Sequence, residues 1–117
     1  MKDLLLQHSK DFANKIVNLT KELDLIHEYC ISNQIKRSAT SIAANLSEAK
    51  YAQSVLDMIS KLEIALKECN ETNTWLDLLF MQKLLDNQKF KTLINQCIKI
   101  KILLIKSIKT LKTKKST

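Results

Sequence analysis

The chain has 117 residues, 45% of them hydrophobic, and contains neither glycine nor proline. Average usage would give roughly 8 glycines and 6 prolines, so tight hairpins, glycine-rich phosphate loops and β-sandwiches are disfavoured. The net charge of +7 is uneven, because residues 1–88 carry 10 basic and 12 acidic side chains, whereas residues 89–117 carry 9 lysines and no acid. Such a block is typical of a polyanion-binding surface, although exposed lysines also serve solubility.

The hydrophobic pattern predicts four helices. The first, at about residues 3–28, has apolar side chains at three- and four-residue steps, namely Leu5, Phe12, Ile16, Leu19, Leu23 and Ile26. The pattern loses register at residues 29–32, where Ser32 or Asn33 can cap the next helix by accepting from its free backbone N–H groups. That second helix, at about residues 33–50, is rich in alanine and serine, which predicts a central helix with close neighbours.

The third helix, at about residues 54–83, has the most regular apolar pattern: Val55, Ile59, Leu62, Leu66, Cys69, Asn73, Leu76 and Phe80. Asn73 is thereby a candidate buried polar residue. The residues Asp86, Asn87 and Gln88 predict a short turn before a fourth helix at about residues 89–112. We therefore expect an all-α, antiparallel up-down four-helix bundle as a single domain over residues 1–112, with a frayed basic tail at 113–117.

The fourth helix is apolar over more of its surface than one bundle core can cover. A core stripe of Phe90, Leu93, Ile94, Cys97, Leu104, Ile108 and Leu111 is widened by Ile98, Ile100, Ile102, Leu103 and Ile105. This surplus predicts a homo-oligomer with Ile98, Ile102 and Leu103 at the interface. Lys101 falls near the centre of the stripe, where it could snorkel to an interface edge or line a channel between subunits.

Several function classes find no support. No stretch approaches the 18 uncharged apolar residues of a membrane span, and the N-terminus lacks a secretory signal. A di-metal bundle needs two Glu-x-x-His motifs, and the nearest approach is Asp24 with His27. Three widely spaced cysteines, Cys30, Cys69 and Cys97, offer no catalytic context. We expect a cytoplasmic, non-enzymatic protein with reduced cysteines and without cofactor or metal.

A polar set shares one flank of the second helix. Arg37, Ser41, Asn45 and Glu48 are separated by four, four and three residues, and Glu68 and Glu71 could face them from the third helix. The favoured interpretation is a structural polar network that fixes the register of the helices, and the alternative is contact with a ligand or RNA.

The segment from Gln34 to Ala49 resembles the signature of a bacterial family, the 23S rRNA intervening-sequence proteins. The matching positions are Gln34, Arg37, Ser41, Ile42, Ala44, Asn45 and Glu48. The likeness extends to residues 10–13 and 61–79, although Ala43 and Ala49 stand where many members have proline and glycine. The resemblance implies a small basic homopentamer of four-helix subunits, and a related branch of the family serves as the accessory protein of diversity-generating retroelements.

Two functions are therefore expected. The first is sequence-insensitive binding of RNA or other nucleic acid through phosphate contacts from the fourth helix, by Lys91, Lys99, Lys101, Lys106, Lys109 and Lys112. The alternative is a protein-interaction scaffold or accessory subunit, for example for a reverse transcriptase. In both cases the chain would also bind copies of itself.

Overall fold

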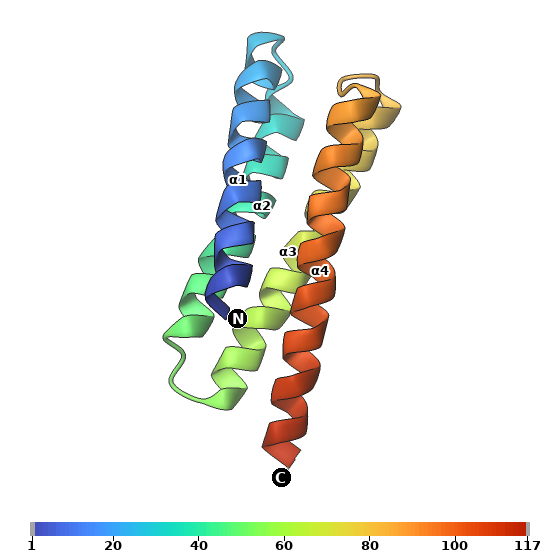
Figure 1. Ribbon diagram of the computed structural model, residues 1–117. Helices are drawn as coiled ribbons and strands as arrows, with labels where there is room; N and C mark the ends of the chain where they lie inside the picture. Colours follow the sequence, from blue (N-terminus) through green and yellow to red (C-terminus); the bar gives the residue numbers. More distant parts are fainter. Residues whose placement is uncertain (1, 117) are drawn as a thin grey trace.

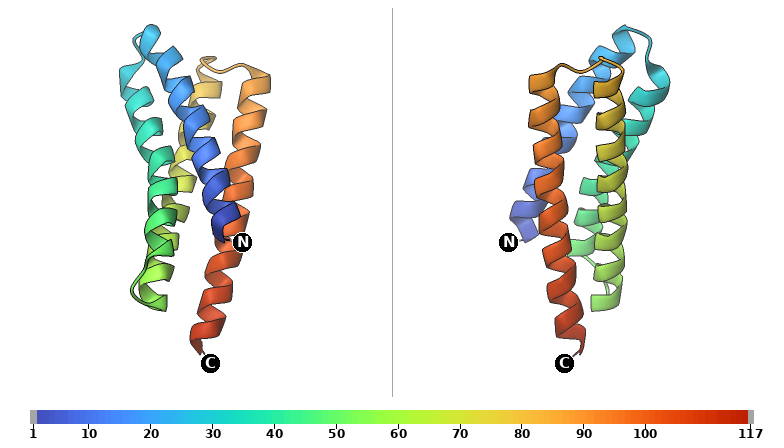
Figure 2. Two further views of the ribbon diagram at one scale, coloured as in Figure 1. Left: turned by 60° about the vertical axis from the view of Figure 1, so that its left-hand side comes forward. Right: turned by 90° about the vertical axis from the view of Figure 1, so that its right-hand side faces the viewer.

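The computed structural model describes residues 2–116, and the side chains of residues 4–114. The described chain consists of four helices without a strand: α1 (Lys2–Leu25), α2 (Tyr29–Lys50), α3 (Val55–Met81) and α4 (Asn87–Ser116). The helices alternate in direction and lie side by side along the 52 Å length of the molecule (Figures 1 and 2). The predicted all-α, up-down four-helix bundle is confirmed.

The pairing of the helices places α2 and α3 at the centre of the packing. These two helices make the most extensive contact, α1 packs mainly on α2, and α4 packs mainly on α3. The contact between α1 and α4 is much smaller, and the left-hand view of Figure 2 shows the two helices diverging away from the N-terminus of α1. The small residues of α2 have the predicted role, because Ser38 and Ala39 are fully buried beside Ile35 and Ile42.

The core face of α3 is broader than the sequence pattern predicted. Ala65, Thr72 and Leu79 are buried together with the expected Leu62, Cys69 and Leu76, whereas the predicted core residues Val55 and Phe80 are exposed. The reason is that α3 contacts both α2 and α4, so it buries two flanks. The prediction of a buried Asn73 is wrong: this residue is half-buried, and its amide lies 3.5 Å from Asp77 Oδ2 on the same helix.

The start of α2 differs from the prediction by four residues. Since α2 begins at Tyr29, Ser32 and Asn33 lie inside the helix and do not cap it. Ser32 is instead fully buried, and its Oγ donates to the backbone carbonyl of Thr20 on α1 at 3.3 Å. The Ser32 side chain, which the local sequence predicted to cap α2, therefore forms a hydrogen bond between α2 and α1 instead.

The starts of α3 and α4 are capped by side chains. Ser54 accepts from the backbone N–H of Asp57 at 3.0 Å, and Asp86 accepts from the backbone N–H of Lys89 at 2.8 Å. Helix α4 continues to Ser116 and so includes residues 113–116, for which a frayed tail was expected. Residue 117 lies outside the described residues.

Two helices end in a left-handed residue that is not glycine. The φ angle is 64° at His27 and 60° at Lys83. In each case the next residue donates its backbone N–H to a carbonyl five positions earlier, Glu28 to Leu23 and Leu84 to Leu79, both at 2.9 Å. These are Schellman caps, which usually hold glycine at the left-handed position. The glycine-free chain thus carries backbone strain of about 1 kcal/mol at each cap.

Candidate nucleic-acid interface

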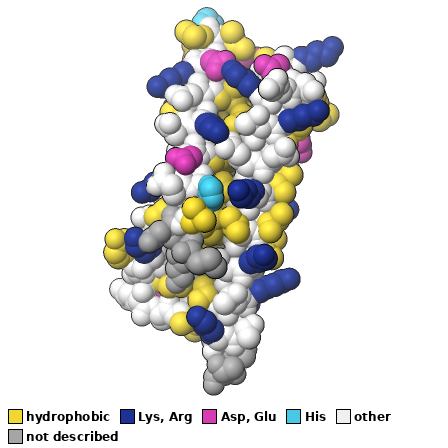
Figure 3. Space-filling model, viewed as in Figure 1, with side chains coloured by type: hydrophobic (Ala, Val, Ile, Leu, Met, Phe, Trp, Pro, Cys, Tyr) yellow, Lys and Arg dark blue, Asp and Glu magenta, His cyan; other side chains and the backbone are white. Residues whose placement is uncertain are grey.

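Four exposed lysines project from α4 without a carboxylate partner. Lys91, Lys99, Lys106 and Lys109 form no ion pair within the described residues, and we call them the α4 lysine face. Figure 3 shows lysine side chains spaced along the α4 side of the molecule. Because unpaired ammonium groups keep their full attraction for anions, this face is the best candidate for phosphate contacts.

The remaining two predicted lysines have different surroundings. Lys112 is exposed but pairs with Glu63 Oε2 on α3 at 3.1 Å. Lys101 is half-buried, and its charge acts on the thiols of Cys69 and Cys97 between α3 and α4. The structure therefore does not place Lys101 on the outer lysine face. Its partial burial sets it apart from the four exposed lysines of α4.

The surface between α1 and α4 is hollowed at two places beside these lysines. A central hollow of about 380 Å³ is lined by His8, Asp11, Asn14, Lys15, Gln96, Lys99 and Ile100. A second, of about 590 Å³, has Leu4, Leu5, Leu103 and Leu111 together with Lys106, Lys109 and Lys114 in its lining. We call the two hollows the α1–α4 groove.

The groove adds a cation from a second helix, which sequence reasoning missed. Lys15 of α1 lines the central hollow together with Lys99 of α4, and it forms no ion pair within the described residues. Its position on the exposed flank of the first helix was visible in the sequence. Its proximity to Lys99 depends on how α1 packs against α4, so the sequence alone could not show it.

The polar set of α2 is divided into separate contacts with α3. Arg37 Nη2 pairs with Glu71 Oε1 at 2.9 Å, and Glu48 pairs with Lys61 at 3.2 Å. Asn45 donates to the carbonyl of Ser41 in its own helix at 2.9 Å. The four α2 residues thus share a flank, as their spacing indicated, but they form two separate ion pairs with α3 and one hydrogen bond within α2.

The three residues predicted for an oligomer interface do not form one patch. Ile98 and Ile102, one helical turn apart, are 42% and 52% exposed. Leu103 is half-buried, packs against the core and lines the α1–α4 groove. Ile100, which contributed to the predicted surplus, is buried in the subunit's own core. The uncovered apolar surface of α4 is therefore centred on Ile98 and Ile102.

The described residues give little support to a metal site or a membrane-spanning segment. Among the described residues, no group of three or more His, Cys, Asp or Glu side chains is placed to hold a metal ion. His27 stacks on Tyr29 with ring centroids 5.6 Å apart, in the turn after α1. Within the same part of the chain, none of the helices has the length and apolar character to cross a membrane.

Known proteins resemble this chain in sequence and in fold. A family model described as 23S rRNA-intervening sequence protein matches residues 2–106. The chain is 44% identical to a crystallised protein of unknown function from the S23 ribosomal protein family of Bacteroides thetaiotaomicron. The alignment covers 93% of this chain and 99% of that one, with a TM-score of 0.88. No curated protein matches the chain.

Proposed function

Since the chain belongs to the 23S rRNA-intervening sequence protein family, we propose that it is a non-enzymatic homopentamer that binds RNA or other nucleic acid through lysines. The observation that carries this proposal is the α4 lysine face, with its four exposed and unpaired ammonium groups. Lysine is a flexible point charge that contacts phosphates but reads little of the base edges, so binding is largely insensitive to sequence.

Assembly would strengthen this electrostatic attraction. Five copies of a chain with net charge +7 carry +35, and a multivalent cation of this kind releases many counterions from a nucleic acid. The exposed Ile98 and Ile102 lie on the same helix as the lysine face and supply apolar surface for a second copy. The number of subunits in this proposal comes from the family resemblance.

A charge-reversal experiment tests whether RNA binding depends on the α4 lysine face or only on the net charge of the protein. The variant Lys99→Glu, Lys106→Glu, Lys109→Glu removes six charges and lowers the net charge from +7 to +1. The matched control Lys10→Glu, Lys21→Glu, Lys67→Glu makes the same change at exposed positions on α1 and α3 that form no ion pair with any residue the structure describes. RNA retention on a filter, with circular dichroism to verify folding, is the measurement.

The two variants should behave differently if the face binds phosphates. We expect the face variant to lose most RNA retention and the control to lose much less. The slope of log affinity against log salt should fall by roughly 2 in the face variant, because three contacts to a single strand are lost. Equal loss in both variants would contradict a localised face, and unchanged retention in both would mean that the lysines only maintain solubility.

A second candidate function, that of a scaffold or accessory subunit for a protein such as a reverse transcriptase, is favoured by the α1–α2 turn. Leu25, Ile26 and Tyr29 are exposed there, at the end of the bundle. Exposed apolar clusters often mark protein contacts. Co-elution with a reverse transcriptase encoded beside this protein would support the scaffold, provided that Leu25→Ser with Ile26→Ser abolishes it while the face variant does not.

A further inference from the structure

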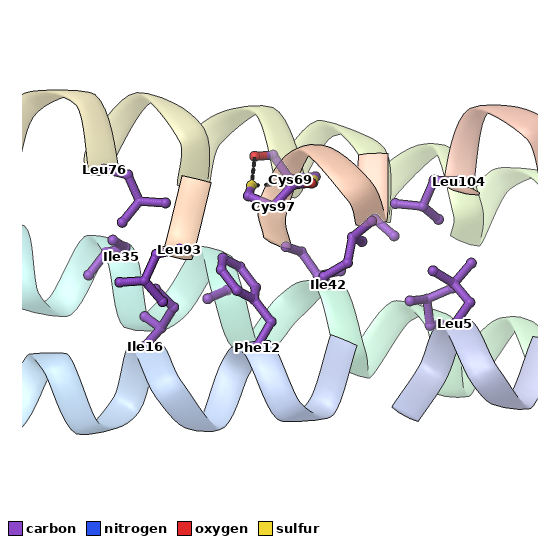
Figure 4. Packing of buried hydrophobic residues seen from close by; sticks show 14 of the residues in the cluster. Leu5, Phe12, Ile16, Ile35, Ile42, Cys69, Leu76, Leu93, Cys97 and Leu104 are labelled. Carbon is purple, nitrogen blue, oxygen red and sulfur yellow. Dashed lines mark hydrogen bonds between the residues drawn. The ribbon is translucent and has the colours of Figure 1, made fainter. Parts of the chain in front are cut away.

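Two buried thiols face each other across the contact between α3 and α4 (Figure 4). Cys69 and Cys97 are each 1% exposed, and their Sγ atoms are 3.6 Å apart. Each Sγ also lies near the backbone carbonyl of the other cysteine, at 3.3 and 3.4 Å. The sulfurs are thus only about 1.5 Å farther apart than in a disulfide bond.

We propose that Cys69 and Cys97 form a redox modification site, at which hydrogen peroxide converts the two thiols into a disulfide that links α3 to α4. The oxidant is assigned to the peroxide class because the pair is nine-tenths buried or more, and a bulky disulfide reagent would not fit between the helices. A molecule little larger than water can reach a buried site when a protein opens locally. This inference is independent of nucleic-acid binding.

The surroundings of the pair favour Cys69 as the nucleophile. The hydrogen bond with Cys97 lowers the pKa of the Cys69 thiol, burial opposes this shift, and the positive charge of Lys101 adds to it. The same hydrogen bond and burial raise the pKa of Cys97. The hydrogen bond therefore favours the thiolate form of Cys69 over that of Cys97, and the thiolate is the reactive form of cysteine.

The reaction balances with peroxide alone. The Cys69 thiolate attacks one peroxide oxygen, the O–O bond breaks, and the departing hydroxide takes up the proton that Cys69 released, giving water and a sulfenic acid. The sulfur of Cys97 then displaces the hydroxyl group from Cys69, which leaves as a second water with the proton of Cys97. The two sulfurs lose two electrons, and the two peroxide oxygens gain them.

The sequence allows a direct test on the unmodified protein. Trypsin places the three cysteines on separate peptides, Cys30 in residues 22–36, Cys69 in 68–83 and Cys97 in 92–99. The folded full-length chain is treated with hydrogen peroxide, denatured, alkylated, digested and analysed by mass spectrometry. We expect peptide 68–83 to be joined to peptide 92–99 with the loss of two hydrogens, and dithiothreitol to separate them.

Two controls make the outcome specific. The exposed Cys30 has no neighbouring thiol within its own chain, so peptide 22–36 should form no intrachain crosslink. Lys101→Met should slow the crosslinking several-fold, whereas Lys91→Met, at an exposed position of α4, should not. Equal rates would overturn the role of Lys101. The site itself would be overturned if both peptides remain alkylated, or if they gain oxygen without joining.

Discussion

Thr72 Oγ1 on α3 lies 2.8 Å from Ser38 Oγ on α2, and both side chains are fully buried. Ser38 donates to the carbonyl of Ile35 at 3.2 Å, so its oxygen can accept from Thr72, whose hydroxyl also lies 2.9 Å from the carbonyl oxygen of Glu68. Arg37 directly precedes Ser38 on α2, and Glu71 directly precedes Thr72 on α3. These two neighbours form an exposed ion pair. A buried hydroxyl pair and a surface ion pair thus fix the same register between the two central helices.

The buried hydrogen bond between Ser38 and Thr72 should contribute measurably to the free energy of unfolding. Ser38→Ala and Thr72→Val should each lower the free energy of unfolding by about 1 kcal/mol, because a buried hydrogen bond of typical strength is lost. The double variant should lose less than the sum of the singles. Urea unfolding followed by circular dichroism measures all three, with Thr74→Val as the control on the exposed side of α3. Strictly additive losses would show that the two hydroxyls do not interact.

The ion pair beside it should contribute less. The side chains of Arg37 and Glu71 are 58% and 29% exposed, and solvent-exposed ion pairs are worth about 0–1 kcal/mol. Arg37→Ala should therefore lower the free energy of unfolding by under about 1 kcal/mol in the same urea experiment. A normal unfolding curve combined with loss of RNA retention would instead assign Arg37 to binding.

Glycine should stabilise both Schellman caps. Lys83→Gly and His27→Gly are each expected to raise the free energy of unfolding by about 0.5–1 kcal/mol, since they relieve a left-handed conformation. Lys83 is the cleaner test, because His27 also stacks on Tyr29. The control, Lys67→Gly in the interior of α3, should destabilise by about 1 kcal/mol. A loss of stability at Lys83 would mean that the left-handed residue is not strained there.

Charge at the exposed apolar surface of α4 should prevent self-association. Ile98→Asp with Ile102→Asp is expected to reduce the particle to smaller species without unfolding the bundle, because both side chains are exposed in the single chain. Size-exclusion chromatography measures this change. Ile64→Asp, at a position of similar exposure on α3, provides the comparison. An equal effect of Ile64→Asp would mean that α4 has no special place in the interface.

The sequence predicted burial correctly where the buried residues recur every three or four positions along one helix face. The apolar positions of the first helix from Leu5 through Leu23 are buried as expected, because one helix face packs inward, whereas Ile26, expected in the same stripe, lies beyond the end of α1 and is exposed. The α3 core was only partly predicted, because Ala65 and Thr72 carry a weak hydrophobic signal. The start of α2 was missed because a distant carbonyl, that of Thr20, satisfies Ser32.

The candidate site was predictable only where it lies on one helix. The α4 lysine face follows from spacing along a single element. The opposition of Lys15 and Lys99, and that of Cys69 and Cys97, depends on how two helices pack, which no local pattern records. The position of Lys101 had no explanation in the sequence for the same reason.

The proposed oligomer and its binding of RNA are tested most directly by the mass of the protein in light scattering, with and without a short structured RNA, at about 50 and about 300 mM salt. A homopentamer that binds RNA through phosphate contacts should have a mass near five subunits, gain mass when RNA is added at low salt, and return to its original mass at high salt. A monomer at micromolar concentration would contradict the oligomer, and an oligomer whose mass never changes with RNA would contradict nucleic-acid binding.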